Sequence, residues 1–168
     1  MSHPRLTPRA ATQEDGAAIA AIYNVGIAER VATFETRPRT PEDICAWLGG
    51  RHPVMVVEDA GHVVAFASSS AYSPRECYAG VADFSIYVAP EARGRGAGRL
   101  AIQALLDAAE AAGFHKLTSR VFATNTRSRA MLASLGFREV GLHEKHASLD
   151  GVWRDIVIVE KLLPANLR

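Results

Sequence analysis

Cysteine is scarce in this chain, because the 168 residues include only Cys45 and Cys77. Two cysteines without metal-ligand or redox spacing exclude a disulfide framework of the kind that stabilises small secreted domains. We expect both to be free thiols in a reducing compartment, although one disulfide between them is compatible with the sequence.

Long apolar runs and a strong charge of either sign are also absent. No stretch approaches the ~20 residues of a membrane-spanning helix, and no apolar signal core follows residues 1–5. A net charge of +1 provides no general attraction to nucleic acid or anionic membranes. We therefore expect a cytoplasmic protein that binds neither. Ordinary hydrophobic and charged content, without repeats or linkers, predicts one globular domain over residues 1–168.

The most informative stretch is a glycine- and arginine-rich turn between a predicted strand and a predicted helix. Phe84, Ile86 and Val88 alternate with polar residues, as in a strand with one buried face. Residues 93–98 then read RGRGAG, and an alanine- and leucine-rich segment follows. Glycine amides at the start of a helix attract anions, and arginines favour phosphate. This stretch therefore predicts a site for a phosphorylated cofactor.

Two common phosphate-binding motifs match this turn poorly. A P-loop requires Gly-Lys-Ser/Thr at its end, which is absent here. A dinucleotide fingerprint requires a third glycine where Arg99 stands. The preceding strand also carries Asp83 and Ser85 on one face, unlike the continuous apolar strand of a Rossmann sheet.

The pattern Arg93-x-x-Gly96-x-Gly98 resembles the acetyl-CoA signature of the GNAT N-acetyltransferase superfamily. Asn125 and the segment 135–137 (LGF) stand where that superfamily places its second cofactor motif. Further patterns, over nearly the whole chain, resemble one branch, the phosphinothricin and arsinothricin N-acetyltransferases. These patterns are Ile22-Tyr23-Asn24, Thr33-Phe34-Glu35, Arg75-x-x-Tyr78 and Gly151-x-Trp153-x-Asp155.

The resemblance implies an α/β (α+β) fold, with a mixed, mostly antiparallel sheet of about seven strands flanked by about four helices. The order of elements read from the sequence agrees with it. We expect strands at residues 5–11, 54–58, 63–67, 83–88, 117–122, 137–146 and 152–163, and helices starting after Thr12, after Thr40, near Arg99 and near Arg127. Gly26 is expected to end the first helix, because glycine weakens helices.

The resemblance also implies acetyl-CoA as cosubstrate, a small-molecule amine as acceptor and a homodimer, and we expect no metal. The predicted cofactor-binding residues lie on the strand edge, in the turn and at the second motif. They are Ile86, Tyr87, Val88, Arg93, Gly94, Arg95, Gly96, Ala97, Gly98, Asn125 and Ser128.

Asp83 is the candidate catalytic base. It is the carboxylate nearest the reacting end of the predicted central strand, and an amine nucleophile must lose a proton. Related acetyltransferases usually carry Glu at this position, so the shorter side chain leaves open a relay through water. A structural aspartate paired with an arginine is the alternative interpretation.

No general acid is evident from the sequence. Relatives place Tyr or His where this chain has Leu132, which cannot donate a proton. Tyr87, His146 or water remain as candidates. His143 and His146 are expected on opposite faces of a strand, which argues against a metal site.

The predicted substrate-binding residues are Phe34, Arg75, Tyr78 and Tyr87. A guanidinium such as that of Arg75 suits a carboxylate, phosphinate or arsinate. The resemblance predicts direct acetyl transfer to the α-amino group of such an amino acid, and hence herbicide or antibiotic resistance. The alternatives are methionine sulfoximine or sulfone, a protein N-terminus, or a non-catalytic CoA-binding module.

Overall fold

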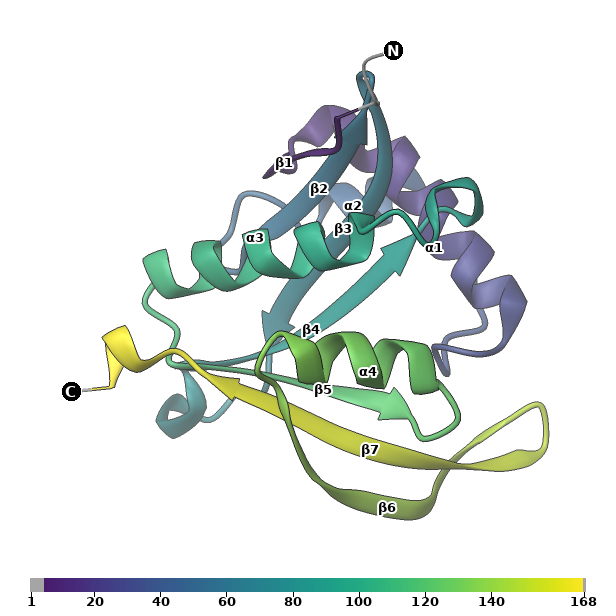
Figure 1. Cartoon of the computed structure of the whole chain (residues 1–168), viewed down its shortest axis with the longest axis vertical. Helices are drawn as coiled ribbons and strands as arrows, with labels where there is room; N and C mark the ends of the chain where they lie inside the picture. Colours follow the sequence, from purple (N-terminus) through teal and green to yellow (C-terminus); the bar gives the residue numbers. More distant parts are fainter. Residues whose placement is uncertain (1–4, 168) are drawn as a thin grey trace.

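The computed structural model describes residues 5–167, and its centre is a seven-stranded sheet in the order β1-β2-β3-β4-β5-β7-β6 (Figure 1). Residues 1–4, which belong to the segment expected to lack a signal core, lie outside the described part, as does residue 168. The strands are β1 Thr7–Ala10, β2 Val54–Asp59, β3 His62–Ala71, β4 Val81–Val88, β5 Lys116–Phe122, β6 Arg138–Leu149 and β7 Val152–Leu162.

Helices cover both faces of the sheet. They are α1 Gly16–Glu29, α2 Pro41–Cys45, α3 Ala97–Ala111 and α4 Thr126–Ser134. In Figure 1, α3 and α4 lie in front of the sheet, and α1 and α2 lie behind it. The front core includes Leu105 of α3 and Val57 of β2, and the back core includes Ile19 of α1 and Val56 of β2. Neighbouring residues of β2 therefore point to opposite cores, as the period of a strand requires.

The sheet is mixed and mostly antiparallel, as predicted. Only β4 and β5 run parallel, and α3 provides the long crossover connection that a parallel pair needs. All the other neighbouring pairs in the sheet are antiparallel. One hairpin is formed by β2 and β3, and another by β6 and β7.

Local capping explains where the first two helices begin. Thr12 caps a short 3-10 turn that leads into α1, and its backbone N–H donates to Asp15 Oδ2 at 2.7 Å. Arg9 of β1 also contacts that carboxylate, at 2.8 Å, so one buried aspartate joins the first strand to the first helix. Thr40 caps α2, with Pro41 at the first helical position, as predicted.

The prediction that Gly26 ends the first helix is wrong. α1 continues to Glu29, and Arg30, with a φ of 59°, closes it. A Cβ atom at Gly26 would lie 2.7 Å from the ring of Tyr87. Glycine is present here because it lets α1 approach β4 closely.

Both cysteines are free thiols, as expected. In the part of the chain that the structure describes, no helix has the length and apolar character needed to cross a membrane.

Candidate active site

The sheet opens between its two parallel strands. β4 and β5 pair only from Val81 to Asp83 of β4, and beyond that point the strands diverge (Figure 1). At the fork, Ser119 Oγ of β5 donates to the carbonyl oxygen of Phe84 at 2.8 Å. Backbone groups of a strand alternate in direction, so those of Ile86 and Val88 point toward the opening, like the Phe84 carbonyl. The Val88 carbonyl accepts from Arg93 Nε at 3.3 Å, and the other strand-edge groups at the opening, those of Ile86 and the N–H of Val88, are offered to a ligand.

A cavity of about 510 Å³ extends from this opening to the glycine turn. All the predicted cofactor-binding residues except Arg95 line it. Gly94 and Gly96 adopt positive φ angles of 78° and 85°, which turn the chain into α3. Among the described residues, no hydrogen bond uses the backbone N–H of Gly94, Arg95 or Gly96. These free amides and the N-terminus of α3 suit a diphosphate.

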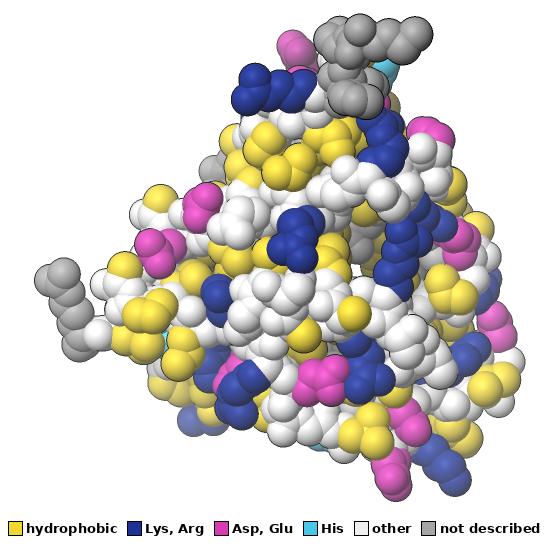
Figure 2. All heavy atoms as spheres, viewed as in Figure 1, with side chains coloured by type: hydrophobic (Ala, Val, Ile, Leu, Met, Phe, Trp, Pro, Cys, Tyr) yellow, Lys and Arg dark blue, Asp and Glu magenta, His cyan; other side chains and the backbone are white. Residues whose placement is uncertain are grey.

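Figure 2 shows lysine and arginine side chains beside a hollow near the start of α3. The arginines of the turn are less available to a phosphate ligand than the sequence suggested, because they are paired with carboxylates. Arg93 makes two contacts with the carboxylate of Glu29, at 2.8 and 2.5 Å, and Arg95 pairs with Asp59 at 2.8 Å. Arg127 of α4, which we did not predict, lines the cavity instead. Its only sequence signal is its place two residues after the predicted Asn125.

The second cofactor motif lies on the other side of this cavity. The Asn125 side chain accepts from the backbone N–H of Ser128 at 3.2 Å and caps α4, and both residues line the cavity. A Cβ atom on Gly98 would meet Val88 and Met131 at 3.3 and 3.4 Å. Glycine at this position lets the start of α3 pack closely between β4 and α4.

A second cavity, of about 400 Å³, contains the candidate base and is called the Asp83 cavity below. It is lined by residues of β4, β5, β6 and β7 and by Tyr72 and Tyr78. The Asp83 side chain is 25% exposed, and the nearest cation is Arg120, at 4.0 Å. Burial raises the pKa of Asp83, and Arg120 opposes this shift. A carboxylate with a raised pKa is well suited to accept a proton.

Tyr87 lies on the cofactor side of β4, and most of it is packed against other aromatic rings. Its ring lies 4.9 Å from that of Tyr23 and 5.5 Å from that of Phe66. Burial raises the pKa of Tyr87 well above its ordinary value. The phenol therefore stays protonated, and it gives up its proton less readily than an exposed tyrosine.

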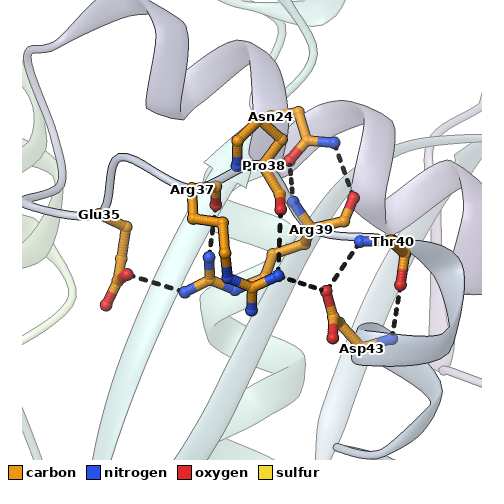
Figure 3. Close-up of polar contacts among 7 residues, drawn as sticks. All are labelled: Asn24, Glu35, Arg37, Pro38, Arg39, Thr40 and Asp43. Carbon is orange, nitrogen blue, oxygen red and sulfur yellow. Dashed lines mark hydrogen bonds and ion pairs between the residues drawn. The ribbon is translucent and has the colours of Figure 1, made fainter.

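Hydrogen bonds and ion pairs hold the connection between α1 and α2 in place (Figure 3). The amide of Asn24 binds both backbone groups of Arg39, at 2.7 and 2.9 Å. The Arg39 guanidinium contacts Glu35 at 2.8 Å and lies 5.5 Å from the Tyr23 ring centroid. These contacts give a structural role to Asn24 and Glu35, which belong to the patterns Ile22-Tyr23-Asn24 and Thr33-Phe34-Glu35.

Phe34, in the same connection, packs against the end of β5. Its ring lies 4.7 Å from that of Phe122, in a small cluster that includes Leu149. Phe34 lines neither cavity, so its observed contacts are those of a residue that packs on the core. A direct contact with substrate stays a prediction.

Arg75 and Tyr78 lie in the turn before β4. Tyr78 lines the Asp83 cavity and packs edge-on against Tyr72 at 5.4 Å. Arg75 does not line the cavity, and its guanidinium lies 5.7 Å from the ring centroid of Tyr78. The structure therefore brings Tyr78, but not Arg75, to the cavity that contains Asp83.

The expectation that His143 and His146 point to opposite faces of a strand is wrong. The register of β6 shifts between these residues, where Lys145 has a φ of 47° and its N–H donates to Asp155 Oδ1 at 2.8 Å. The two imidazoles stack at 4.3 Å and line the Asp83 cavity together. A bulge held by a residue of another strand is invisible to periodicity. No metal-binding group of three or more His, Cys, Asp or Glu side chains occurs within residues 5–167.

Leu132, at the position where the resemblance predicted a proton donor, is buried in the front core. It belongs to the hydrophobic cluster that also contains Phe137 and Leu105 of α3. The general acid therefore does not come from this position of α4.

Comparison with known proteins agrees with this geometry. The Acetyltransferase (GNAT) family profile matches residues 19–137. YwnH of Bacillus subtilis is 36% identical over 162 residues, covering 94% of this chain and 99% of its own. A phosphinothricin N-acetyltransferase of Streptomyces coelicolor is 32% identical (92% and 95% covered), and an L-methionine sulfoximine/L-methionine sulfone acetyltransferase of Pseudomonas paraeruginosa is 30% identical (84% and 86%). The chain belongs to the GNAT acetyltransferase family.

A solved structure supports the same assignment. A phosphinothricin acetyltransferase of Sinorhizobium meliloti, crystallised with acetyl-CoA, superposes with a TM-score of 0.88 at 29% identity, covering 94% of this chain and 88% of its own. The protein is thus an N-acetyltransferase, and acetyl-CoA is its cosubstrate. The glycine cradle, the free amides and the strand edge described above fit that molecule.

Proposed function

We propose that this enzyme acetylates the α-amino group of a small anionic amino acid of the phosphinothricin or arsinothricin kind, and so acts in resistance or detoxification. The observation that carries the proposal is the Asp83 cavity, in which a carboxylate with a raised pKa lies opposite a cation. Its volume suits a small molecule, and relatives over nearly the whole chain are named for amino-acid substrates.

The roles of the chain's own residues follow from their places. The amides of residues 94–96 and the start of α3 hold the diphosphate, and the edge at Ile86 and Val88 holds the pantetheine arm. Acetyl-CoA supplies the acetyl group as an activated thioester. An N–H of that edge polarises the acetyl carbonyl, and Asp83 accepts the proton of the amine, directly or through water. The amine nitrogen bonds to the carbonyl carbon as the C–S bond of the thioester breaks, and the CoA thiolate leaves and takes up a proton from water. Neither Cys45 nor Cys77 lines either of the two cavities described above, in agreement with direct transfer to the amine.

A second candidate acceptor is methionine sulfoximine or sulfone, as the name of the Pseudomonas relative suggests. These amino acids carry an α-carboxylate but no anionic side chain. A protein N-terminus is a third, less favoured candidate, because a peptide lacks the free α-carboxylate that a cation of the cavity would bind.

The test is an acetyl-CoA-dependent thiol-release assay over a panel of amines. We expect turnover with phosphinothricin or arsinothricin at a higher kcat/KM than with methionine sulfone, and none with a peptide N-terminus. Release with the sulfone alone favours the second candidate. Release with peptides but no free amino acid would contradict the proposal.

We further propose that the enzyme is a cytoplasmic homodimer. Two free thiols fit a reducing compartment. The hairpin of β6 and β7 exposes several large hydrophobic side chains, namely Val140, Leu142, Val152 and Trp153. Apolar groups gathered on one exposed element are typical of protein–protein interfaces.

A further inference from the structure

The Asp83 cavity contains a cation whose hydrogen-bonding capacity is unused. Arg120 projects from β5, and its side chain is 56% exposed. Its nearest carboxylate oxygen, Asp83 Oδ2, lies 4.0 Å away, whereas every other ion pair between described residues measures 3.4 Å or less. Within residues 5–167, no hydrogen bond involves the Arg120 guanidinium. Its five N–H donors are therefore available to a ligand.

The other charges of the cavity are already paired. Lys116 binds Glu160 at 2.9 Å, and Arg138 binds the same carboxylate at 2.5 Å. The titratable groups that line the cavity with Asp83 and Arg120 are Tyr72, Tyr78, Lys116, His143, His146 and Glu160. Among these described groups, Asp83 and Arg120 are the pair of opposite charges that lie close together without a hydrogen bond between them.

We propose that Asp83 and Arg120 bind the head group of an α-amino acid, with Arg120 on the α-carboxylate and Asp83 on the α-amino nitrogen. This inference rests on the proposed function and names the part of the acceptor that the cavity recognises. In an α-amino acid the two groups share one carbon, so the protein groups that bind them must be close neighbours. A separation of 4.0 Å meets that requirement. A planar guanidinium can also donate two parallel hydrogen bonds to the two oxygens of a carboxylate.

Binding at Arg120 also affects the base. Burial raises the pKa of Asp83, and the positive charge of Arg120 opposes that shift. A carboxylate bound to Arg120 cancels part of this charge, so Asp83 takes up a proton more readily once the acceptor is in place. Arg120 therefore links recognition of the acceptor to the strength of the base.

Arg75, the arginine that the sequence suggested for the anion, is less well placed. It lies against Tyr78 outside the cavity, whereas Arg120 lines it. The position of Arg120 on the predicted strand 117–122 does not reveal this role, because β4 approaches it from a distant part of the chain.

The experiment compares two acceptors with their α-carboxamides: phosphinothricin and methionine sulfone. Thiol release at saturating acetyl-CoA gives KM and kcat for the native enzyme, Arg120→Gln, Arg120→Lys and Arg75→Gln. Arg37→Gln, on the exposed α1–α2 connection, is the matched control. We expect Arg120→Gln to raise KM for the free acids about 10- to 100-fold, as for a lost charged hydrogen bond. KM for the carboxamides should change less than about twofold, and Arg120→Lys should be intermediate.

The outcomes separate this inference from the proposed function. Equal effects of Arg120→Gln on acids and carboxamides, or no effect on either, overturn the inference and leave the function standing. Selective loss in Arg75→Gln assigns the carboxylate to Arg75 and also overturns it. If the native enzyme acetylates no amino acid, the proposed function fails. In that case, calorimetric titration of phosphinothricin into the native and Arg120→Gln proteins tests the inference by binding alone. An unchanged melting temperature of the variant shows that it is folded.

Discussion

At the scale of single residues, the requirements of the site and of stability conflict at Asp83. Burial raises the pKa of this carboxyl group in the folded chain. Such a group binds its proton more tightly in the folded chain than in the unfolded chain. Its contribution to the stability of the fold is fully present below the pKa of the unfolded chain, and it is lost as pH rises through the pKa of the folded chain. Near neutral pH the ionised Asp83 therefore destabilises the fold, while the same ionised form is the one that accepts a proton.

Asp83→Asn should therefore lose activity and gain stability. We expect kcat to fall at least about 100-fold, because a general base is removed. The rising limb of the pH–rate profile that Asp83 causes should disappear, whereas a limb from the acceptor amine should remain. The melting temperature should rise at pH 7 and 8 and approach that of the native protein near pH 3.

Activity and thermal unfolding across pH measure both effects. Asp107→Asn is the matched control, since Asp107 is exposed on α3 and lines neither cavity. Turnover that survives in Asp83→Asn would falsify the assignment of the base.

At the scale of elements, the turn before α3 offers an anion the N–H groups of its backbone more than the side chains of its arginines. Glu29 and Asp59 draw Arg93 and Arg95 into ion pairs, so the glycine amides stay exposed while these side chains support the turn. Arg127, at the start of α4, takes the place in the cavity that the sequence suggested for Arg95.

Arg127→Ala should weaken acetyl-CoA binding, and Arg95→Ala should not. We expect the Kd for acetyl-CoA to rise about 10-fold in the first variant, as for a charged hydrogen bond to phosphate. In Arg95→Ala it should change less than about twofold, because Arg95 lies outside the cavity. Isothermal titration calorimetry at low and high salt measures the Kd of both variants. The difference in Kd between Arg127→Ala and the native enzyme should shrink at high salt, because salt screens the charge. The reverse order of the two effects contradicts this account of the cofactor site.

At the scale of the whole molecule, the last hairpin stands out from the rest of the fold. In Figure 1, β6 and β7 form the lower edge of the sheet, and the turn that joins them extends past the end of α4. Almost all of β6 is exposed, although it is among the longest strands. A long exposed edge strand with apolar side chains invites association unless a partner covers it.

If this hairpin forms the homodimer interface, a charge placed on it should produce monomers. We expect Leu142→Glu and Trp153→Glu each to lower the mass measured by light scattering during size-exclusion chromatography to that of one chain. Val25→Glu is the control, since Val25 is similarly apolar but lies on α1. A native mass of one chain, or a dimer that persists in both hairpin variants, argues against this interface.

Much of the fold could be predicted because its signals are local. Alternation of apolar residues located the strands, and Thr12 and Thr40 marked helix starts through their own capping contacts. The failures at Gly26 and at the histidine pair have one cause. Each depends on a distant residue, Tyr87 in the first case and Asp155 in the second.

The sequence by itself determined the order of elements, the glycine turn before α3 and Asp83 as the carboxylate on the central strand, because each follows from neighbours in the chain. Only the tertiary structure decided which charges are already paired and which are free. Ion pairs such as Arg93–Glu29 form between distant segments, and Arg120 reaches Asp83 only because two parallel strands meet. Folding, rather than residue order, therefore left Arg127 and Arg120 available to ligands.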